Sequence, residues 1–167
     1  MNQNLQTILV QKILQHIDAG TTQLADEIYA NPVSNYTSTE RLSMEFEVLF
    51  RQRPLLVGLS CQLPEPGDFL TCDHTGIPQL IVRGEDRKVR AFVNVCRHRG
   101  ARVAEGHGNT RKRFRCPYHG WNYDTSGKLV GIPDKQSFPG IDRTACSLIP
   151  LPVTESDGMI WASATPL

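Results

Sequence analysis

Two short cysteine–histidine pairs hold the residues of this chain that could do chemistry. The first is C-R-H at residues 96–98 and the second is C-P-Y-H at residues 116–119, with seventeen residues between them. Each pair offers one thiolate and one imidazole, and together they form a ligand set that suits either zinc or an iron–sulfur cluster. Gly100 and Gly120 follow the two pairs closely, and glycine lets a backbone approach a bulky inorganic group.

The region around these pairs is strongly basic, although the whole chain carries a net charge of only +1. Overall neutrality gives no general attraction to nucleic acid or to a membrane. Between Cys96 and His119, however, seven cations accompany one anion, Glu105, so this window is +6 and the remainder is −5. The cations are Arg97, Arg99, Arg102, Arg111, Lys112, Arg113 and Arg115. Such a run is either a solvated face or a docking surface for an acidic partner.

Hydrophobic spacing predicts that the first third of the chain is helical. Residues 4–19 place Leu5, Leu9, Ile13 and Ile17 four apart, and Gly20 follows as a stop signal, which is typical of an amphipathic helix. A second short helix is predicted over residues 22–30. A third is predicted to begin with a capping box, Thr37-x-x-Glu40, and to end before Pro54.

From residue 55 the pattern changes to short apolar runs separated by turn residues. Strands are predicted near residues 55–60, 69–72, 79–83, 89–95, 113–116, 121–123, 128–130 and 159–162. Residues 125–127 form a predicted hairpin turn. So many short strands favour an antiparallel sandwich or a small barrel, with each cysteine–histidine pair following a strand.

The other cysteines and histidines are predicted to have no chemical role. Five cysteines are an odd number without the spacing of a small disulfide framework, which favours a reducing, cytoplasmic compartment. The N-terminal segment lacks a signal-peptide pattern, and no apolar stretch is long enough to span a membrane. We expect three cysteines to be small buried hydrophobic residues and three histidines to be structural or exposed. These are Cys61, Cys72, Cys146, His16, His74 and His107.

Both pairs resemble the cluster-binding loops of Rieske proteins. The matching segments are C-R-H-R-G-A at residues 96–101 and C-P-Y-H-G-W-N-Y-D-T-S-G at 116–127. A wider frame, over roughly residues 35–163, resembles the N-terminal part of the α subunit of Rieske non-haem iron ring-hydroxylating oxygenases. The resemblance implies a 2Fe-2S cluster, with Cys96 and Cys116 holding one iron and His98 and His119 the other.

This resemblance also implies a domain plan. A helical segment, 1–53, would precede a Rieske 2Fe-2S domain, 54–163, which is mostly β and folds as an antiparallel Rieske-type sandwich or barrel with a cluster-binding subdomain. Residues 164–167 would lead to a catalytic domain absent from this sequence, where a mononuclear Fe(II) is expected. The chain itself would hold no catalytic residue.

The same resemblance predicts an electron-transfer function. Electrons would come from an acidic ferredoxin or reductase and pass to the mononuclear iron of an aromatic ring-hydroxylating dioxygenase or monooxygenase. The full-length subunit would be a trimer. Two alternatives stay open: a standalone Rieske-type ferredoxin, and a structural zinc module with two cysteines and two histidines.

Details of the loops predict a reduction potential toward the low end of the Rieske range, which spans about −150 to +300 mV. Ala101, Tyr118 and Trp121 stand where high-potential Rieske proteins carry a disulfide and a serine, whereas Tyr123 keeps the position of their cluster-facing tyrosine. Residues 131–133, G-I-P, are predicted to form a proline-bearing loop over the cluster.

Overall fold

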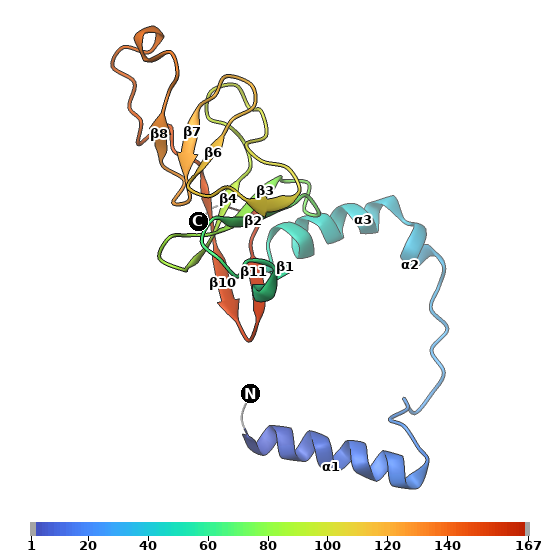
Figure 1. The fold of residues 1–167 in the computed structure, drawn as a ribbon. Coiled ribbons are helices and arrows are strands. Elements are labelled where there is room, and N and C mark those ends of the chain that lie inside the picture. The colour runs from blue at the N-terminus through green and yellow to red at the C-terminus, as the bar shows by residue number, and fades with distance from the viewer. Residues whose placement is uncertain (1–2, 166–167) are drawn as a thin grey trace. The chain divides into compact units, whose positions relative to one another are not determined.

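The structure is a computed structural model that describes residues 3–165, and the chain divides into two compact units, one up to Ser38 and one from Thr39 onward (Figure 1). The first unit contains α1 (Gln3–Ala19) and α2 (Ser34–Thr37). Helix α1 confirms the predicted amphipathic helix. Gly20, at φ +60°, ends it in a Schellman motif, in which the Gly20 amide donates to Ile17 and the Thr21 amide donates to His16.

The helix predicted over residues 22–30 is wrong, because this stretch is irregular. Its large apolar side chains, Leu24, Ile28 and Tyr29, are almost fully exposed. A helix of nine residues is marginal in water unless it packs against another surface.

The second unit begins with α3 (Thr39–Glu45), which continues as a π-helical segment over Phe46–Arg51. This confirms the third predicted helix but not its predicted start. Thr37 is the last residue of α2, and its hydroxyl donates to the Val33 carbonyl instead of capping α3.

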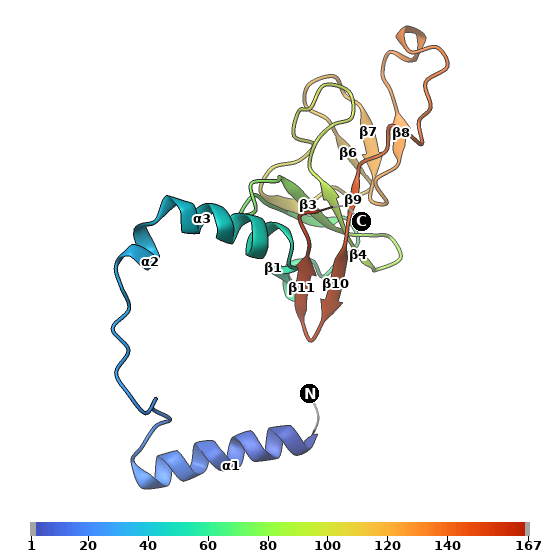
Figure 2. The same cartoon turned by 180° about the vertical axis from the view of Figure 1, so that it is seen from behind.

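Three antiparallel sheets form the rest of the second unit, and the views in Figures 1 and 2 show the five-stranded sheet between the other two. One sheet has the order β1-β11-β10, the second β5-β2-β3-β4-β9 and the third β6-β7-β8. The strands are β1 (Leu55–Leu59), β2 (Asp68–Cys72), β3 (Gln79–Arg83), β4 (Val89–Val93), β5 (His107–Asn109), β6 (Arg113–Arg115), β7 (Asn122–Asp124), β8 (Leu129–Gly131), β9 (Pro150–Leu151), β10 (Val153–Ser156) and β11 (Met159–Ala162). The antiparallel β fold with N-terminal helices is as predicted.

Strand β3 is the centre of the unit, since all five of its residues are buried. Its side chains alternate between two cores, as the period of a strand requires. Leu80 and Val82 join the core that includes Cys96, Cys116 and residues of the β6-β7-β8 sheet. Ile81 joins the core shared with the β1-β11-β10 sheet.

Every predicted strand is present within a residue or two, and three observed strands were not predicted. Strand β5 contains a glycine and two polar residues, β9 has only two residues, and β10 is largely polar and exposed. None of the three has the alternating apolar pattern from which strands are predicted. Within residues 3–165, no helix has the length and apolar character needed to cross a membrane.

Candidate iron–sulfur site

The two cysteine–histidine loops have the same backbone closure. In the first loop, the Cys96 amide donates to the Ala101 carbonyl at 2.7 Å and the Gly100 amide donates to the Cys96 carbonyl at 3.0 Å. In the second, the Cys116 amide donates to Trp121 at 2.8 Å and the Gly120 amide to Cys116 at 3.0 Å. Both glycines have left-handed backbones, with φ values of +74° and +70°. This requirement explains glycine at the fourth position after each cysteine.

The fold brings both predicted histidines together. Their ring centroids lie 4.6 Å apart, and the ring planes are inclined by 67°. His98 is partly buried, whereas His119 is exposed. The four residues singled out from the sequence therefore share one end of the second unit, although each cysteine–histidine pair comes from a different sheet.

Both cysteines are free thiols and each is only 2% exposed. Burial raises the pKa of the Cys96 thiol, and the neighbouring Cys116 thiol raises it further, while bonds from Tyr123 and from the His98 amide lower it. Two adjacent buried thiols resist ionisation for as long as no cation compensates their charge. A bound metal supplies that charge and deprotonates its thiol ligands.

Tyr123, which is completely buried, connects the two loops. Its hydroxyl oxygen accepts a bond from the Arg97 amide at 3.1 Å and lies 3.3 Å from Cys96 Sγ. Because the amide occupies an acceptor position, the hydroxyl proton is free to point at the sulfur. Burial raises the pKa of Tyr123, which keeps the hydroxyl protonated as a donor.

His98 gives the clearest test of whether these residues fit a cluster. Its Nδ1 atom is buried and makes no hydrogen bond among the described residues. A buried nitrogen without a partner is costly unless something else binds it. Desolvation, with the nearby charges of His119 and Arg99, lowers the pKa of His98 and favours the neutral imidazole that binds a metal. These residues fit a 2Fe-2S cluster.

The described residues contain no group of three or more His, Cys, Asp or Glu side chains gathered around one ion position. A two-iron cluster does not require such a group, because each iron is bound by only two protein side chains.

Asn94, two residues before Cys96, closes the base of the first loop. Its buried amide oxygen accepts the Val103 and Ala104 amides at 3.0 and 3.2 Å, and its nitrogen donates to the Ala104 carbonyl at 2.7 Å. Sequence reasoning missed this residue. The sequence shows only a polar residue at the end of an apolar run, and its burial is seen in the structure alone.

Pro133 packs beside Gly120 of the second loop, and its predicted place over a cluster stays a prediction. A side chain at Gly120 would place its Cβ only 2.9 Å from Pro133 Cγ and 3.3 Å from Arg115 Nε. Gly120 is therefore required by close packing as well as by its backbone conformation.

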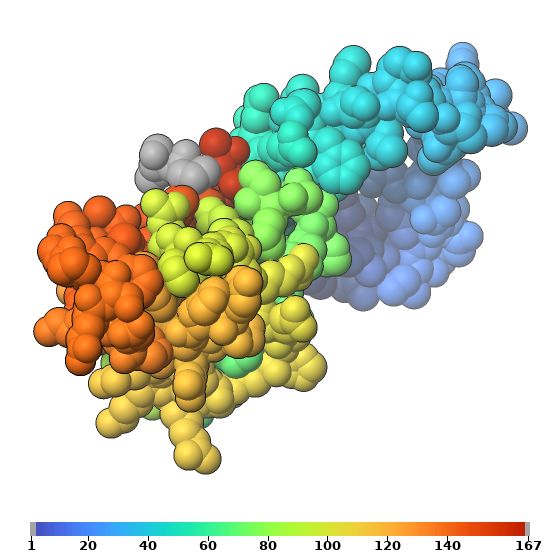
Figure 3. Space-filling model, turned by 90° about the horizontal axis from the view of Figure 1, so that it is seen from above, coloured from blue at the N-terminus to red at the C-terminus, as the bar shows by residue number. Residues whose placement is uncertain are grey.

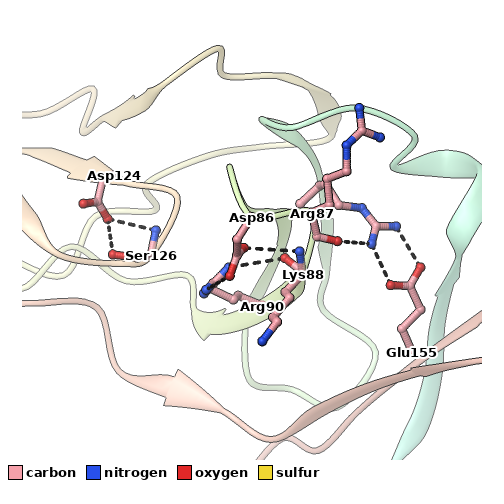
Figure 4. A network of polar contacts seen from close by, with 8 residues as sticks. Asp86, Arg87, Lys88, Arg90, Asp124, Ser126 and Glu155 are labelled. Carbon is pink, nitrogen blue, oxygen red and sulfur yellow. Dashed lines mark hydrogen bonds and ion pairs between the residues drawn. The ribbon is translucent and has the colours of Figure 1, made fainter.

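The basic window does not form one surface. Arg97 and Arg99 are exposed in the first loop, and Arg115 directly precedes Cys116. Arg111 and Lys112 lie in the turn before β6, so the length of that strand separates them from the second loop. There, Lys112 and Arg113 share a pocket with Glu85, Asp86 and Asp124. Figure 4 shows part of this mixed-charge region, where Asp86 bonds Arg90.

The other cysteines and histidines take no part in the site. Cys72 is buried and Cys146 is partly buried, as predicted, but Cys61 is exposed and that prediction is wrong. Cys61 lies in the 3-10 turn Ser60–Gln62, which has no buried residue. His74 is exposed in a turn and His107 is exposed at the start of β5, in line with the prediction for both.

Fold and sequence agree on the family: the Rieske [2Fe-2S] domain model matches residues 53–150, and the chain belongs to this family. Among curated relatives, the chain is 36% identical over 148 residues to the biphenyl 2,3-dioxygenase subunit alpha of Rhodococcus jostii strain RHA1. The aligned region covers 87% of this chain and 32% of that protein.

Solved structures of Rieske oxygenases have the same fold. The apo form of the quaternary ammonium Rieske monooxygenase CntA superposes with a TM-score of 0.75 and 31% identity, covering 84% of this chain and 41% of that one. Naphthalene 1,2-dioxygenase from Rhodococcus sp. also gives a TM-score of 0.75, with 27% identity over 98% of this chain and 36% of that one. The present chain thus spans about a third of the length of the curated relatives it matches.

Proposed function

We propose that this chain is the electron-transfer domain of a ring-hydroxylating oxygenase α subunit, and that it holds a Rieske 2Fe-2S cluster. Cys96 and Cys116 would hold one iron, and His98 and His119 the other. The observation that carries this proposal is the buried, unpartnered Nδ1 of His98 beside the His119 ring and two buried free thiols. The family match and the names of the relatives support it.

When bound, such a cluster accepts and returns one electron, at a potential raised by its two neutral histidine ligands. The chain's own residues prepare the site. The closed loops fix the two thiols, Tyr123 directs a hydroxyl toward Cys96, and burial excludes water from the sulfurs. Ala101, Tyr118 and Trp121 offer neither a disulfide nor a serine hydroxyl, so we place the potential toward the low end of the range of about −150 to +300 mV.

Ligand variants test the assignment. We expect the anaerobically purified protein to contain iron and sulfide, to absorb visible light and to give a Rieske EPR signal after reduction. His98→Ala and His119→Ala should each abolish that signal, whereas His74→Ala, at an exposed histidine outside the site, should leave it unchanged. A colourless protein that binds one zinc ion would favour the zinc module and overturn the proposal.

We further propose that the electron donor is an acidic ferredoxin or reductase that docks beside the first loop. Arg97 and Arg99 are exposed next to His98, while Lys112, before β6, shares a pocket with acidic residues that reduce its attraction for a partner. Positive charge near the cluster would steer an acidic protein and accelerate its encounter.

A charge-reversal pair tests this location. Arg97→Glu with Arg99→Glu should slow reduction by an acidic ferredoxin about 10-fold or more at low ionic strength, and the difference should shrink as salt is added. Arg111→Glu with Lys112→Glu makes the same change of net charge at the other end of β6 and should have a much smaller effect. Equal effects of the two double variants would refute the proposed docking position.

The larger protein context is also part of the proposal. The relatives, named as oxygenase subunits, favour delivery of the electron to a mononuclear iron in a catalytic domain over a standalone ferredoxin. For a full-length subunit we propose a trimer and a cytoplasmic location. The reading frame that follows Leu167 tests this directly: a D-x-x-H-x(4)-H pattern there supports the subunit, and a stop codon supports the ferredoxin.

A further inference from the structure

The ring of His98 is enclosed by two aromatic side chains. It stacks on Trp121 with a centroid distance of 4.8 Å and an angle of only 4° between the planes. Phe138 stands edge-on to both rings, at 5.4 Å and 86° from His98 and at 5.5 Å and 83° from Trp121. One face of the imidazole is thus covered by a buried indole, and Phe138 closes a second side.

His119 has different surroundings. Apart from His98, the ring packed against it is Tyr118, at a centroid distance of 3.9 Å, and Tyr118 is itself 61% exposed. No described side chain covers His119 in the way that Trp121 and Phe138 cover His98. The two imidazoles of the site are therefore held by different means.

Phe138 lies in a connection for which the sequence predicted a role in the site only at its first two residues, Ile132 and Pro133. Residues 132–149 connect β8 to β9 and contain only one short 3-10 turn, Lys135–Ser137. Seen from above, this orange segment lies against the cluster-binding loops (Figure 3). Phe138, Ile141 and Cys146 pack from it onto the core that contains both site cysteines.

Apart from the rings of Trp121 and Phe138, the ring that packs against the His98 imidazole in the described structure is His119. The buried Nδ1 of His98 has no hydrogen-bond partner among residues 3–165. The last torsion of a histidine side chain is soft, so an imidazole without a bonded nitrogen turns easily. In many metal sites an outer hydrogen bond prevents this turning.

We propose that Phe138, acting with Trp121, is a positioning residue that holds the His98 imidazole in its iron-binding orientation and excludes water from it. The stack on Trp121 fixes the plane of the ring, and the edge of Phe138 keeps the ring from rotating out of that plane. This inference rests on the proposed role of His98 as a ligand. It assigns to segment 132–149 a function in the site.

Substitution of Phe138 by leucine tests the inference, because leucine keeps an apolar side chain there and removes the ring. In the holoprotein, Phe138→Leu should accelerate cluster loss to a chelator by about 2- to 10-fold, the range expected for one lost aromatic contact. Pulsed EPR of the reduced protein in D2O should show an altered nitrogen coupling for one histidine and new exchangeable deuterons near the cluster. Phe138→Tyr, which keeps the ring, should restore the wild-type values.

Phe69→Leu is the matched control. Phe69 makes an edge-on contact with Phe114 at 5.3 Å and 80° on the same core, but it contacts neither histidine ring. It should lower overall stability without changing the histidine couplings. Identical nitrogen couplings and cluster lifetimes in Phe138→Leu and the wild type would overturn the inference. A wild-type protein without a histidine-bound cluster would instead refute the proposed function.

Discussion

Arg83 and Glu155 form a bidentate ion pair that joins the five-stranded sheet to the β1-β11-β10 sheet. The guanidinium nitrogens of Arg83 donate to the two carboxylate oxygens at 2.6 and 2.7 Å, and Figure 4 shows the Glu155 carboxylate with the dashed bonds that it accepts. Arg83 also donates to the carbonyls of Leu63 and Arg87, so each nitrogen of its buried guanidinium group has at least one acceptor. Such paired bonds are among the strongest that side chains make.

This pair makes the stability of the second unit depend on pH. The bonds from Arg83, with a smaller contribution from the Ser60 hydroxyl, lower the pKa of Glu155 from 4.5 to about 2. A carboxyl with a lowered folded-state pKa stabilises the fold fully above its ordinary pKa and loses that contribution as pH falls toward the lower value. We expect a loss of about 1–2 kcal/mol between pH 5 and pH 2, after solvent screening of a partly exposed side chain.

Chemical denaturation at several pH values measures this effect. Glu155→Gln cannot titrate, so it should be less stable at pH 6 and should show a flatter pH dependence between pH 5 and 2. Glu65→Gln, at an exposed carboxylate 3.5 Å from Arg87, should follow the wild-type curve. Parallel curves for Glu155→Gln and the wild type would contradict the prediction.

Tyr123 should raise the reduction potential of the site. Its hydroxyl lies 3.3 Å from Cys96 Sγ, and a hydrogen bond to a thiolate ligand favours the more negative, reduced state. Tyr123→Phe removes about 1 kcal/mol of interaction, which for a one-electron couple is on the order of 40 mV. We therefore expect a potential lower by about that amount in an EPR-monitored titration. Tyr118→Phe, at an exposed ring with no hydroxyl bond among the described residues, should not shift it.

Asn94 should hold the first loop closed. In Asn94→Leu, the oxygen that accepts the Val103 and Ala104 amides and the nitrogen that donates to Ala104 are both lost. We expect a loss of about 2–3 kcal/mol and faster hydrogen exchange at the Val103 and Ala104 amides. Asn109→Leu removes similar bonds of an exposed asparagine, to Pro66, Asp68 and Arg111, and it should cost much less. Unchanged exchange at those two amides would rule out this role for Asn94.

Gly127 should tolerate no side chain. Its φ is +82°, and a Cβ there would lie 2.4 Å from Phe92 Cε1, so Gly127→Ala combines a strained backbone with a clash against a buried ring. We expect a loss of more than about 2 kcal/mol in the free energy of unfolding. Gly140→Ala has nearly the same backbone strain, at φ +74°, but open space around it. The smaller loss of unfolding free energy in Gly140→Ala measures the backbone contribution alone. Equal losses in the two variants would show that the clash with Phe92 is relieved without cost.

The sequence predicted the site better than it predicted the surroundings that hold it. Spacing and residue type were enough to select both cysteine–histidine pairs, because the loops are local and each glycine is required by its own backbone. Asn94 and Phe138 could not be predicted in the same way. Their roles depend on which residues lie opposite them in space, and a single asparagine or phenylalanine carries no such information.

The helical region shows the same limit. Helix α1 is seventeen residues long, has its own stop signal at Gly20 and was predicted correctly, although none of its residues is buried, whereas the nine residues 22–30 are irregular. A short segment gains too little from its own hydrogen bonds to be predicted from spacing alone. The strands with apolar runs were predicted, and β5, β9 and β10, which have no such run, were missed.

Identical closure of the two loops bears on how this domain tolerates changes of length. The backbone bonds close each loop within five residues of its cysteine, so each loop is complete in itself. An insertion between a cysteine and its glycine would break that closure and displace a candidate ligand. The turn at residues 110–112 lies between β5 and β6, which belong to different sheets and do not pair, so an insertion there would lengthen a connection and leave both loops intact. This turn is therefore free to change in length, whereas the spacing inside each loop is not.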